Sequence, residues 1–235
     1  MSEVENLGGI ILKKLNLLSV AAILSMSLFT ATTTFAEEVE PPVDDAKKAE
    51  SHVKVGIEPG DDKEPTNPID PEDPDNPGEG GTGQTGNLTI DMVTNLDFGA
   101  FKLSSEATTL TANKENKANP TAQVTDKRGT GAGWTLGVEM SDFKSADEHI
   151  LKGAQLSIPK GELKTNNTDK TLAPENFALV VNKEQQVIMT ANKDKGLGTW
   201  ADSYDKEQTK LAIPAGNYVG EYASTLTWTL SNAPK

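Results

Sequence analysis

Paired acidic residues are the side chains of this sequence that could carry out chemistry most directly. The candidate pairs are Asp142 with Glu148 and Asp202 with Asp205. A glycan hydrolase needs two carboxylates set across a cleft, one of them acting as a proton donor. Residues 81–235 contain 18 acidic side chains, however, so that short spacings of this kind arise by chance. We therefore expect that the protein is not an enzyme.

Cysteine and histidine give no support to a metal or redox site. The sequence has no cysteine, which excludes a disulfide framework, a cysteine nucleophile and thiolate ligands. Its two histidines, His52 and His149, are too few for a histidine-based metal site. His149 lies in the polar stretch Ser-Ala-Asp-Glu-His-Ile, where a solvated turn residue is expected. We expect neither a cofactor nor a bound metal.

Aromatic residues offer a different chemistry, because the C–H faces of sugars stack on exposed rings. Two of the three tryptophans lie in identical Trp-Thr-Leu triplets, at residues 134–136 and 228–230. Each triplet sits in a segment in which apolar and polar residues alternate, the pattern of a half-buried β-strand. Two interpretations of Trp134 and Trp228 stay open. They are core residues of an apolar strand face, or they are exposed and contact a ligand.

The third tryptophan lies in a different sequence setting. Trp200 follows the stretch Lys-Asp-Lys-Gly-Leu-Gly-Thr, and Tyr204 comes four residues after it. Glycine and aspartate at this density predict a loop. In a loop, both rings are candidates for accessory contacts to a glycan; the alternative is that Trp200 covers the core from the loop. The basic pair Lys127-Arg128, next to Asp126, is expected to be a solvated turn.

Short strands are the elements that must position these residues. From Leu88 onward, segments rich in Val, Ile, Thr and aromatic residues are separated by Gly, Pro, Asn and Asp clusters, and none has a helical period. About nine such strands predict an all-β domain, and a β-sandwich is favoured over a barrel. The predicted strands lie in residues 88–93, 96–103, 121–126, 133–140, 154–159, 177–181, 186–192, 209–214 and 218–230.

The net charge of −13 is concentrated in one segment. Residues 37–80 contain 15 acidic and 4 basic side chains, whereas residues 81–235 contain 18 acidic and 16 basic ones. The nearly neutral part has no basic stripe, which argues against a nucleic-acid partner. Eight of the 13 prolines fall between Pro41 and Pro77. Residues 37–86 are therefore predicted to form an extended, disordered acidic linker, in which the alternating stretch 51–59 could form a stray strand.

The beginning of the sequence has the pattern of a secretory signal peptide. Lys13 and Lys14 precede an apolar run, which is followed by small residues ending at Ala36. We predict a signal peptide over residues 1–36, with cleavage after Ala36. The apolar run is short for a membrane span, so no span is expected in the cleaved protein. The acidic stretch before Lys13 leaves the translation start open.

With both triplets placed, the chain resembles the WxL-domain cell-surface proteins of low-GC Gram-positive bacteria. The resemblance rests on two W-x-L motifs about ninety residues apart, behind a leader and an acidic proline-rich linker. It covers everything after the predicted signal peptide. The stretches that carry it are residues 85–101, 118–143, 151–159, 187–200 and 222–234.

The resemblance implies a WxL cell-wall-binding domain over residues 87–235 of a secreted surface protein. It implies non-covalent attachment to the cell wall, with peptidoglycan as the ligand, and assembly with co-encoded surface proteins, including sortase-anchored ones. The alternative is a structural subunit that an anchored partner holds at the wall. The attachment motifs of the family map onto Trp134, Thr135, Leu136, Trp228, Thr229 and Leu230.

Overall fold

The computed structural model describes residues 49–61, 63–70, 80–112 and 118–232. The predicted signal peptide therefore lies outside the described residues. The chain divides into two compact units, Met1–Lys54 and Val55–Lys235, and the fold described below belongs to the second. None of the helices in the described ranges has the length and hydrophobicity of a membrane span.

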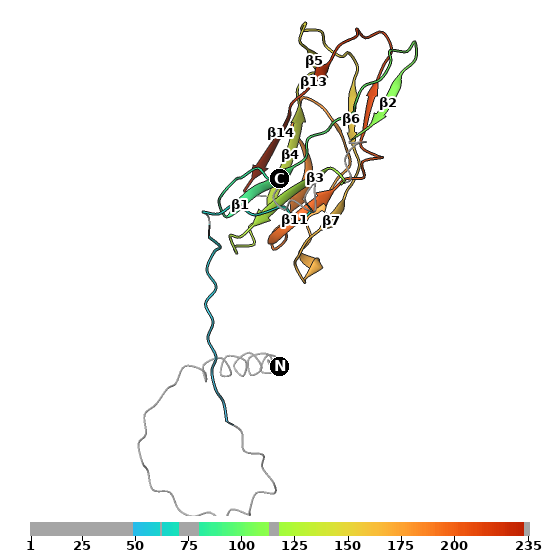
Figure 1. Ribbon diagram of the computed structural model, residues 1–235. Helices are drawn as coiled ribbons and strands as arrows, with labels where there is room; N and C mark the ends of the chain where they lie inside the picture. The colour runs from blue at the N-terminus through green and yellow to red at the C-terminus, as the bar shows by residue number, and fades with distance from the viewer. Residues whose placement is uncertain (1–48, 62, 71–79, 113–117, 233–235) are drawn as a thin grey trace, which may run out of the picture. The chain divides into compact units, whose positions relative to one another are not determined.

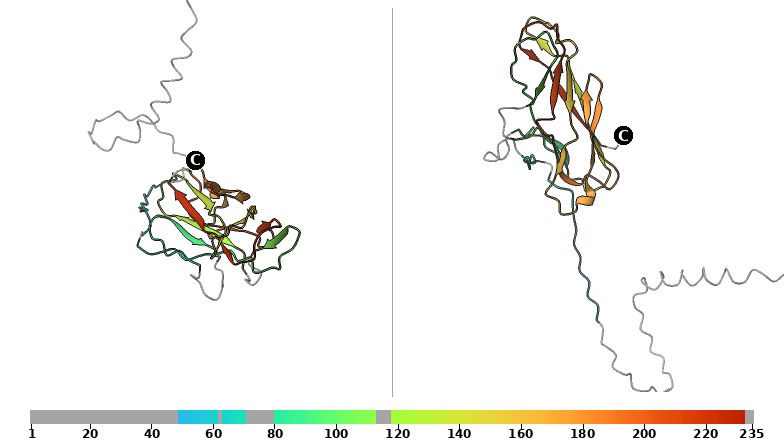
Figure 2. Two further views of the ribbon diagram at one scale, coloured as in Figure 1. Left: turned by 90° about the horizontal axis from the view of Figure 1, so that it is seen from above. Right: turned by 90° about the vertical axis from the view of Figure 1, so that its right-hand side faces the viewer.

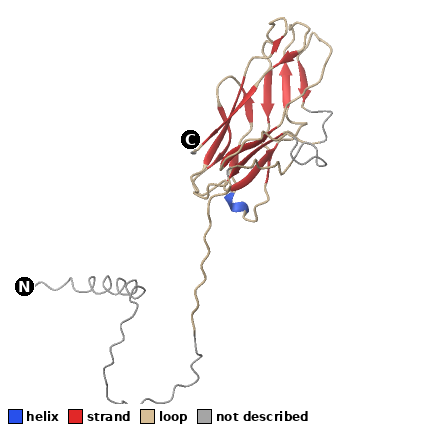
Figure 3. Cartoon of the chain, turned by 60° about the vertical axis from the view of Figure 1, so that its left-hand side comes forward, coloured by secondary structure: helices blue, strands red, loops and turns tan. Residues whose placement is uncertain are grey.

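The described part of the second unit is built almost entirely from β-strands, as the sequence predicts. One helical element is described, the 3-10 turn η1 (Figure 3). The elements are β1 (Leu88–Val93), β2 (Thr108–Thr111), β3 (Thr121–Asp126), β4 (Trp134–Met140), β5 (Lys144–Ser145), β6 (Gln155–Ile158), β7 (Glu162–Lys164), η1 (Lys170–Leu172), β8 (Glu175–Asn176), β9 (Leu179–Val181), β10 (Gln186–Ala191), β11 (Gly198–Ser203), β12 (Lys210–Ile213), β13 (Tyr222–Ala223) and β14 (Leu226–Ser231).

These strands form three four-stranded antiparallel sheets and one two-stranded ribbon. Sheet A has the order β1-β3-β11-β7, sheet B the order β2-β12-β6-β9, and sheet C the order β14-β4-β10-β8; β13 pairs with β5. Figure 1 shows sheet A at one end of the domain and β2, β5, β6 and β13 toward the other, and Figure 2 shows the same domain from above and from the side.

One hydrophobic core lies between the sheets. Its buried residues come from alternate positions of the strands, such as Ile90 and Val124 in sheet A and Leu156 and Leu211 in sheet B. Side chains on a strand point alternately to the two faces, and β4 accordingly contributes every second residue to this core, Trp134, Leu136, Val138 and Met140. The packing of several antiparallel sheets on a common interior confirms the predicted β-sandwich architecture.

Two predictions about individual strands were wrong, and one strand that the sequence left open is not formed. Residues 96–103 form an irregular loop, because Gly99 adopts a positive φ of 67° and its N–H donates to Asp97 Oδ1. The long final strand, predicted over residues 218–230, begins only with β13 and continues as β14. Residues 51–59 form no strand, and their apolar side chains are exposed.

Part of the predicted linker contacts the domain. Residues 63–70, which we call the strap, have no regular secondary structure and hydrogen-bond to side chains of sheet A. Further along the chain, Thr82 N donates to Asp91 O, and Gly81 forms an isolated bridge with Met92. The sequence analysis predicted an extended, disordered linker here and did not predict these contacts. The boundary at residue 87 stays a prediction.

Candidate functional site

The two Trp-Thr-Leu triplets lie on neighbouring strands. β14 pairs with β4 in antiparallel register, with Leu230 opposite Leu136 and Trp228 opposite Val138. β4 is central in sheet C, between β14 and β10, whereas β14 is the edge strand. The identical triplets therefore have different surroundings, which decides how far each tryptophan is exposed.

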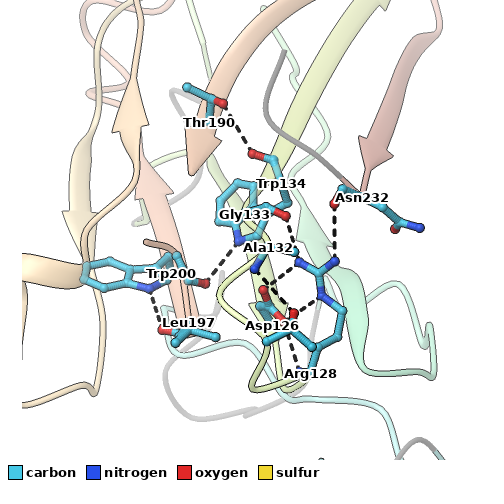
Figure 4. A network of polar contacts seen from close by, with 11 residues as sticks. Asp126, Arg128, Ala132, Gly133, Trp134, Thr190, Leu197, Trp200 and Asn232 are labelled. Atoms are coloured by element: carbon cyan, nitrogen blue, oxygen red, sulfur yellow. Dashed lines mark hydrogen bonds and ion pairs between the residues drawn. The ribbon is translucent and has the colours of Figure 1, made fainter. Parts of the chain in front are cut away.

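The tryptophan of the first triplet is a core residue. Trp134 is 0% exposed, and its Nε1 donates to Gly196 O at 3.0 Å (Figure 4). Gly196 has a φ of 72°, and a Cβ there would come within 2.5 Å of Trp134 Nε1. Leu136 is buried beside it, while Thr135 turns to the opposite face and its hydroxyl pairs with that of Thr190 at 3.1 Å. The first triplet thus offers no exposed ring.

Arg128 connects the ends of the two triplet segments through hydrogen bonds. Arg128 Nη2 binds Asp126 Oδ2 at 2.7 Å and also donates to Gly133 O, directly before Trp134 (Figure 4). Its Nη1 donates to Asn232 O, just after β14. Hydrogen bonding to the Asp126 carboxylate raises the pKa of Arg128 above its ordinary value. Arg128 is therefore not the solvated turn residue that the sequence predicted, because Asp126 is fully buried and needs its charge balanced.

The tryptophan of the second triplet reaches the surface. Trp228 is half-buried, and it lines a groove of about 890 Å³ between the irregular loop at residues 94–103 and the segment 217–226. Leu226 lines the same groove, and Leu230 is half-buried on the same strand face. On the opposite face of β14, Thr227 and Thr229 are exposed.

Aromatic side chains gather in this groove, which we call the aromatic groove. In the described ranges, every aromatic side chain that is not buried lines it, with the exception of Phe177. At its rim, the exposed Tyr218 ring stacks on His149, with ring centroids 4.4 Å apart. The exposed position of His149 agrees with its predicted turn setting. The aromatic residues of the groove are Phe98, Phe101, Phe143, Tyr218, Tyr222 and Trp228.

Sequence reasoning found only Trp228 among these six residues. The available signal was the aromatic content of residues 96–103 and 218–222, two segments next to glycines. Both were predicted to be strands, and a strand would have placed alternate rings in the core. In the structure, residues 96–103 and 218–221 are irregular and Tyr222 begins the short β13, and their aromatic side chains line one groove.

Comparison with known proteins agrees with the family that the two triplets indicate. The model of one protein family, described as WxL domain surface cell wall-binding, matches residues 44–234. The chain belongs to the WxL family. No curated protein and no solved structure matches the sequence. The WxL match begins well before β1 and includes the strap, so the length that matches the family extends beyond the strands.

Trp200 and Tyr204 are buried in the WxL domain, whereas the sequence predicted that they lie in a loop. Trp200 lies in β11, a central strand of sheet A, and is 1% exposed; its Nε1 donates to Leu197 O at 2.9 Å. Tyr204 is 3% exposed. The predicted loop is wrong, because β11 pairs with β3 on one side and β7 on the other. Neither ring is accessible to a sugar, so neither is an accessory contact.

The acidic residues of the two candidate pairs lie in different environments in the WxL domain. Asp142 and Glu148 each form an ion pair with a lysine, Lys183 and Lys144 respectively. Asp202 is fully buried while Asp205 is exposed, so these two do not face a common cleft. Burial raises the pKa of Asp202 to about 6, although Asn176 Nδ2 donates to its Oδ1 at 2.6 Å. In the described ranges, no group of acidic and histidine side chains is arranged to hold a metal ion.

Proposed function

We propose that this WxL protein is secreted and is held non-covalently at the Gram-positive cell wall by its C-terminal β-domain, with peptidoglycan bound at the aromatic groove. The observation that supports this proposal is the gathering of six aromatic side chains, including the motif residue Trp228, at one groove. Rings of this kind stack on sugar C–H faces, and Glu221 among the lining residues accepts hydrogen bonds from hydroxyls.

The two motifs have different roles in this proposal. Trp134, Thr135 and Leu136 keep β4 in place at the centre of sheet C, and Trp228 presents its ring to the ligand from the edge strand. Leu230 pairs with Leu136 and fixes the register of the edge strand. Thr229 contributes to the exposed polar face of β14, away from the groove. No catalytic step is part of the proposal.

A second candidate function is that of a subunit in a surface protein complex, tethered at the wall by an anchored partner. The observation that favours it is the exposed aliphatic surface at the rim of the same groove. Leu103 is 55% and Val219 is 80% exposed, and both line the groove. Apolar side chains of this exposure are typical of surfaces that bind proteins.

Binding of the purified chain from residue 37 to protein-free peptidoglycan tests both candidates. We expect the wild type to sediment with the wall material, and the Phe101→Ala and Tyr218→Ala variants to bind at least several-fold more weakly. Phe177→Ala is the matched control, because Phe177 is 39% exposed and lies outside the groove, while Phe101 is 38% exposed within it. Thermal melting should be the same for all four proteins.

The outcomes separate the two functions. One result is that the wild-type protein does not bind protein-free peptidoglycan while it binds walls that still carry their surface proteins. This result would exclude direct glycan binding and favour the function of a subunit in a surface protein complex. Equal binding by the groove variants and the Phe177→Ala control would exclude the aromatic groove as the contact. Material extracted from whole cells by denaturant should have its unmodified mass, and a peptidoglycan adduct would contradict non-covalent attachment.

A further inference from the structure

The outer face of sheet A is polar and yet buried. Thr89 and Asp91 of β1, Gln123 and Thr125 of β3, and Thr199 of β11 are all almost inaccessible to solvent. Asp91 lies at the centre of this group. It accepts hydrogen bonds from Thr89 Oγ1 at 2.6 Å, from Gln123 Nε2 at 2.9 Å and from Thr125 Oγ1 at 2.5 Å. A buried polar face of this kind needs partners that complete its hydrogen bonds.

The strap supplies such partners through its backbone. Gln123 Oε1 accepts a hydrogen bond from Ile69 N at 2.7 Å, and Gln123 Nε2 donates to Asn67 O at 3.2 Å. The side-chain amide thus pairs with the backbone on both sides of Pro68, which is buried between these two residues. Proline has no N–H that needs a hydrogen-bond partner, so it suits the position between the two backbone groups that Gln123 binds.

A charged contact holds the strap at its C-terminal end. Asp70 Oδ2 pairs with Lys164 Nζ of β7 at 2.7 Å, and Thr121 Oγ1 lies 3.5 Å from the same oxygen. The bound sequence is therefore recognised at three consecutive points: the carbonyl of Asn67, the ring and following N–H at Pro68-Ile69, and the carboxylate of Asp70. Together they define a recognition pattern of the form x-Pro-x-Asp, because Asn67 is contacted through its backbone carbonyl and its side chain is exposed.

Sheet A is complete without the strap. Its four strands pair with one another through backbone ladders, and the strap is not a fifth strand. Its contacts with the sheet run mainly through side chains of Gln123, Thr121 and Lys164, and Pro68 is the buried residue of the strap. A segment attached in this way resembles a docked peptide more than a structural strand.

The sequence contains the bound dipeptide more than once. Asn67-Pro68 is followed by Asp70-Pro71, Asp73-Pro74 and Asn76-Pro77, so that an Asx-Pro dipeptide recurs every three residues. A polyproline II helix has three residues per turn, so this spacing in the sequence equals one turn of such a helix. Glu72 and Asp75 keep the repeat acidic.

We propose that the outer face of sheet A is a binding site for an acidic proline peptide of the form x-Pro-x-Asp, which this chain fills reversibly with its own residues 67–70. When another peptide replaces the strap on this face, residues 63–70 are released. The chain that connects the domain to the residues before the strap then becomes longer. The site lies on sheet A and includes none of the residues of the aromatic groove, so it does not rest on the proposed wall contact.

Cleavage of the folded full chain tests this proposal. A recognition sequence for a site-specific protease, inserted after Pro77, allows the chain to be cut once it has folded. We expect the N-terminal fragment to co-elute with the domain in size-exclusion chromatography, and an excess of synthetic peptide covering residues 63–72 to displace it. Weaker retention at high salt is expected, because Asp70 and Lys164 are both partly exposed.

Matched variants identify the contacts. Asp70→Asn, a change in the ligand that leaves the domain intact, should weaken retention about threefold to tenfold, because it removes the ion pair to Lys164. Glu64→Gln makes the same charge change at an exposed strap residue and should have no effect. Gln123→Ala should release the fragment, and Gln185→Ala, an exposed glutamine near sheet C, should not.

Three results would overturn the proposal. Separation of the wild-type fragment immediately after cutting would show that the face does not hold the peptide. A fragment that excess peptide cannot displace would be a permanent part of the fold. Equal retention of the Asp70→Asn and Glu64→Gln fragments would show that the site does not recognise the carboxylate of Asp70.

Discussion

Leu136 of β4 and Leu230 of β14 are directly paired across the antiparallel ladder. The two Trp-Thr-Leu triplets therefore meet at their leucines and point in opposite directions along sheet C. Trp228 lies opposite Val138, four positions along β4 from Trp134, so the two tryptophan backbones are about 14 Å apart along the strands. One tryptophan is consequently enclosed by the core and the other opens into the aromatic groove.

Replacement of Trp134 should damage the fold rather than a binding contact. Trp134→Ala is expected to lower the free energy of unfolding by about 3–5 kcal/mol, because it leaves a cavity in the core. Trp134→Phe should cost less, since it keeps a ring and loses the bond to Gly196 O. Urea titration followed by circular dichroism measures both. A Trp134→Ala variant with wild-type stability and no wall binding would contradict this assignment.

Gly196 should not tolerate a side chain. Its positive φ already disfavours alanine by about 1–2 kcal/mol, and the new Cβ would lie 2.3 Å from Ala191 Cβ. Gly216→Ala is the control, because Gly216 also has a positive φ but a Cβ added there would have no neighbour within 4 Å. We expect a clearly lower melting temperature for Gly196→Ala than for Gly216→Ala. Equal melting temperatures would mean that the close packing against Trp134 and Ala191 is unimportant.

Arg128→Ala should be strongly destabilising, because it leaves the buried Asp126 carboxylate without its counter-charge. Loss of one partner of a buried ion pair costs about 3–5 kcal/mol. Adding Asp126→Asn to this variant should restore part of the loss. Lys144→Ala, which breaks an exposed ion pair with Glu148, should cost at most about 1 kcal/mol. Chemical denaturation of the four proteins tests this ranking, and similar values for Arg128→Ala and Lys144→Ala would refute it.

The stability of the domain should depend on the ionisation of Asp202. Because burial raises its pKa to about 6 in the folded state, the folded protein holds a proton there that the unfolded chain releases near its ordinary value of 3.8. The resulting stabilisation is complete below about pH 4 and is lost as the pH rises to about 6, by at most about 3 kcal/mol.

Asp202→Asn isolates this effect, since Asp91 also has a raised pKa and remains in both proteins. The difference in unfolding free energy between variant and wild type should change in favour of the variant between pH 4 and pH 7. A difference that is the same at every pH in this range would show that Asp202 does not titrate near 6.

The strand pattern of the domain could be predicted where burial on one face was regular. β1, β3, β4 and β6 have apolar residues at alternate positions, β10 and β12 have short apolar runs, and all six were predicted within a residue or two. β11 was missed because its sequence, Gly-Thr-Trp-Ala-Asp-Ser, has no apolar alternation. Its strand conformation comes from the pairing with β3 and β7, which local sequence does not contain.

The candidate site was harder to predict than the fold. Identical triplets gave no means of telling a central strand from an edge strand, so the different exposures of Trp134 and Trp228 could not be derived from sequence. The aromatic groove depends on Phe101 and Tyr218 lying in irregular segments, where side-chain direction follows no period. The strap contacts depend on Gln123, an ordinary strand residue whose role comes from what lies across it.

The pairing of β14 with β4 has a consequence for folding. The paired residues Leu136 and Leu230 are about ninety positions apart, and contacts of such long range form slowly because a large loop must close first. Sheet C cannot be completed until both strands are available. A chain that has emerged only as far as β12 still lacks the edge strand that shields Leu136 and Val138. The domain should therefore complete its fold only once β14 has been synthesised and can pair with β4.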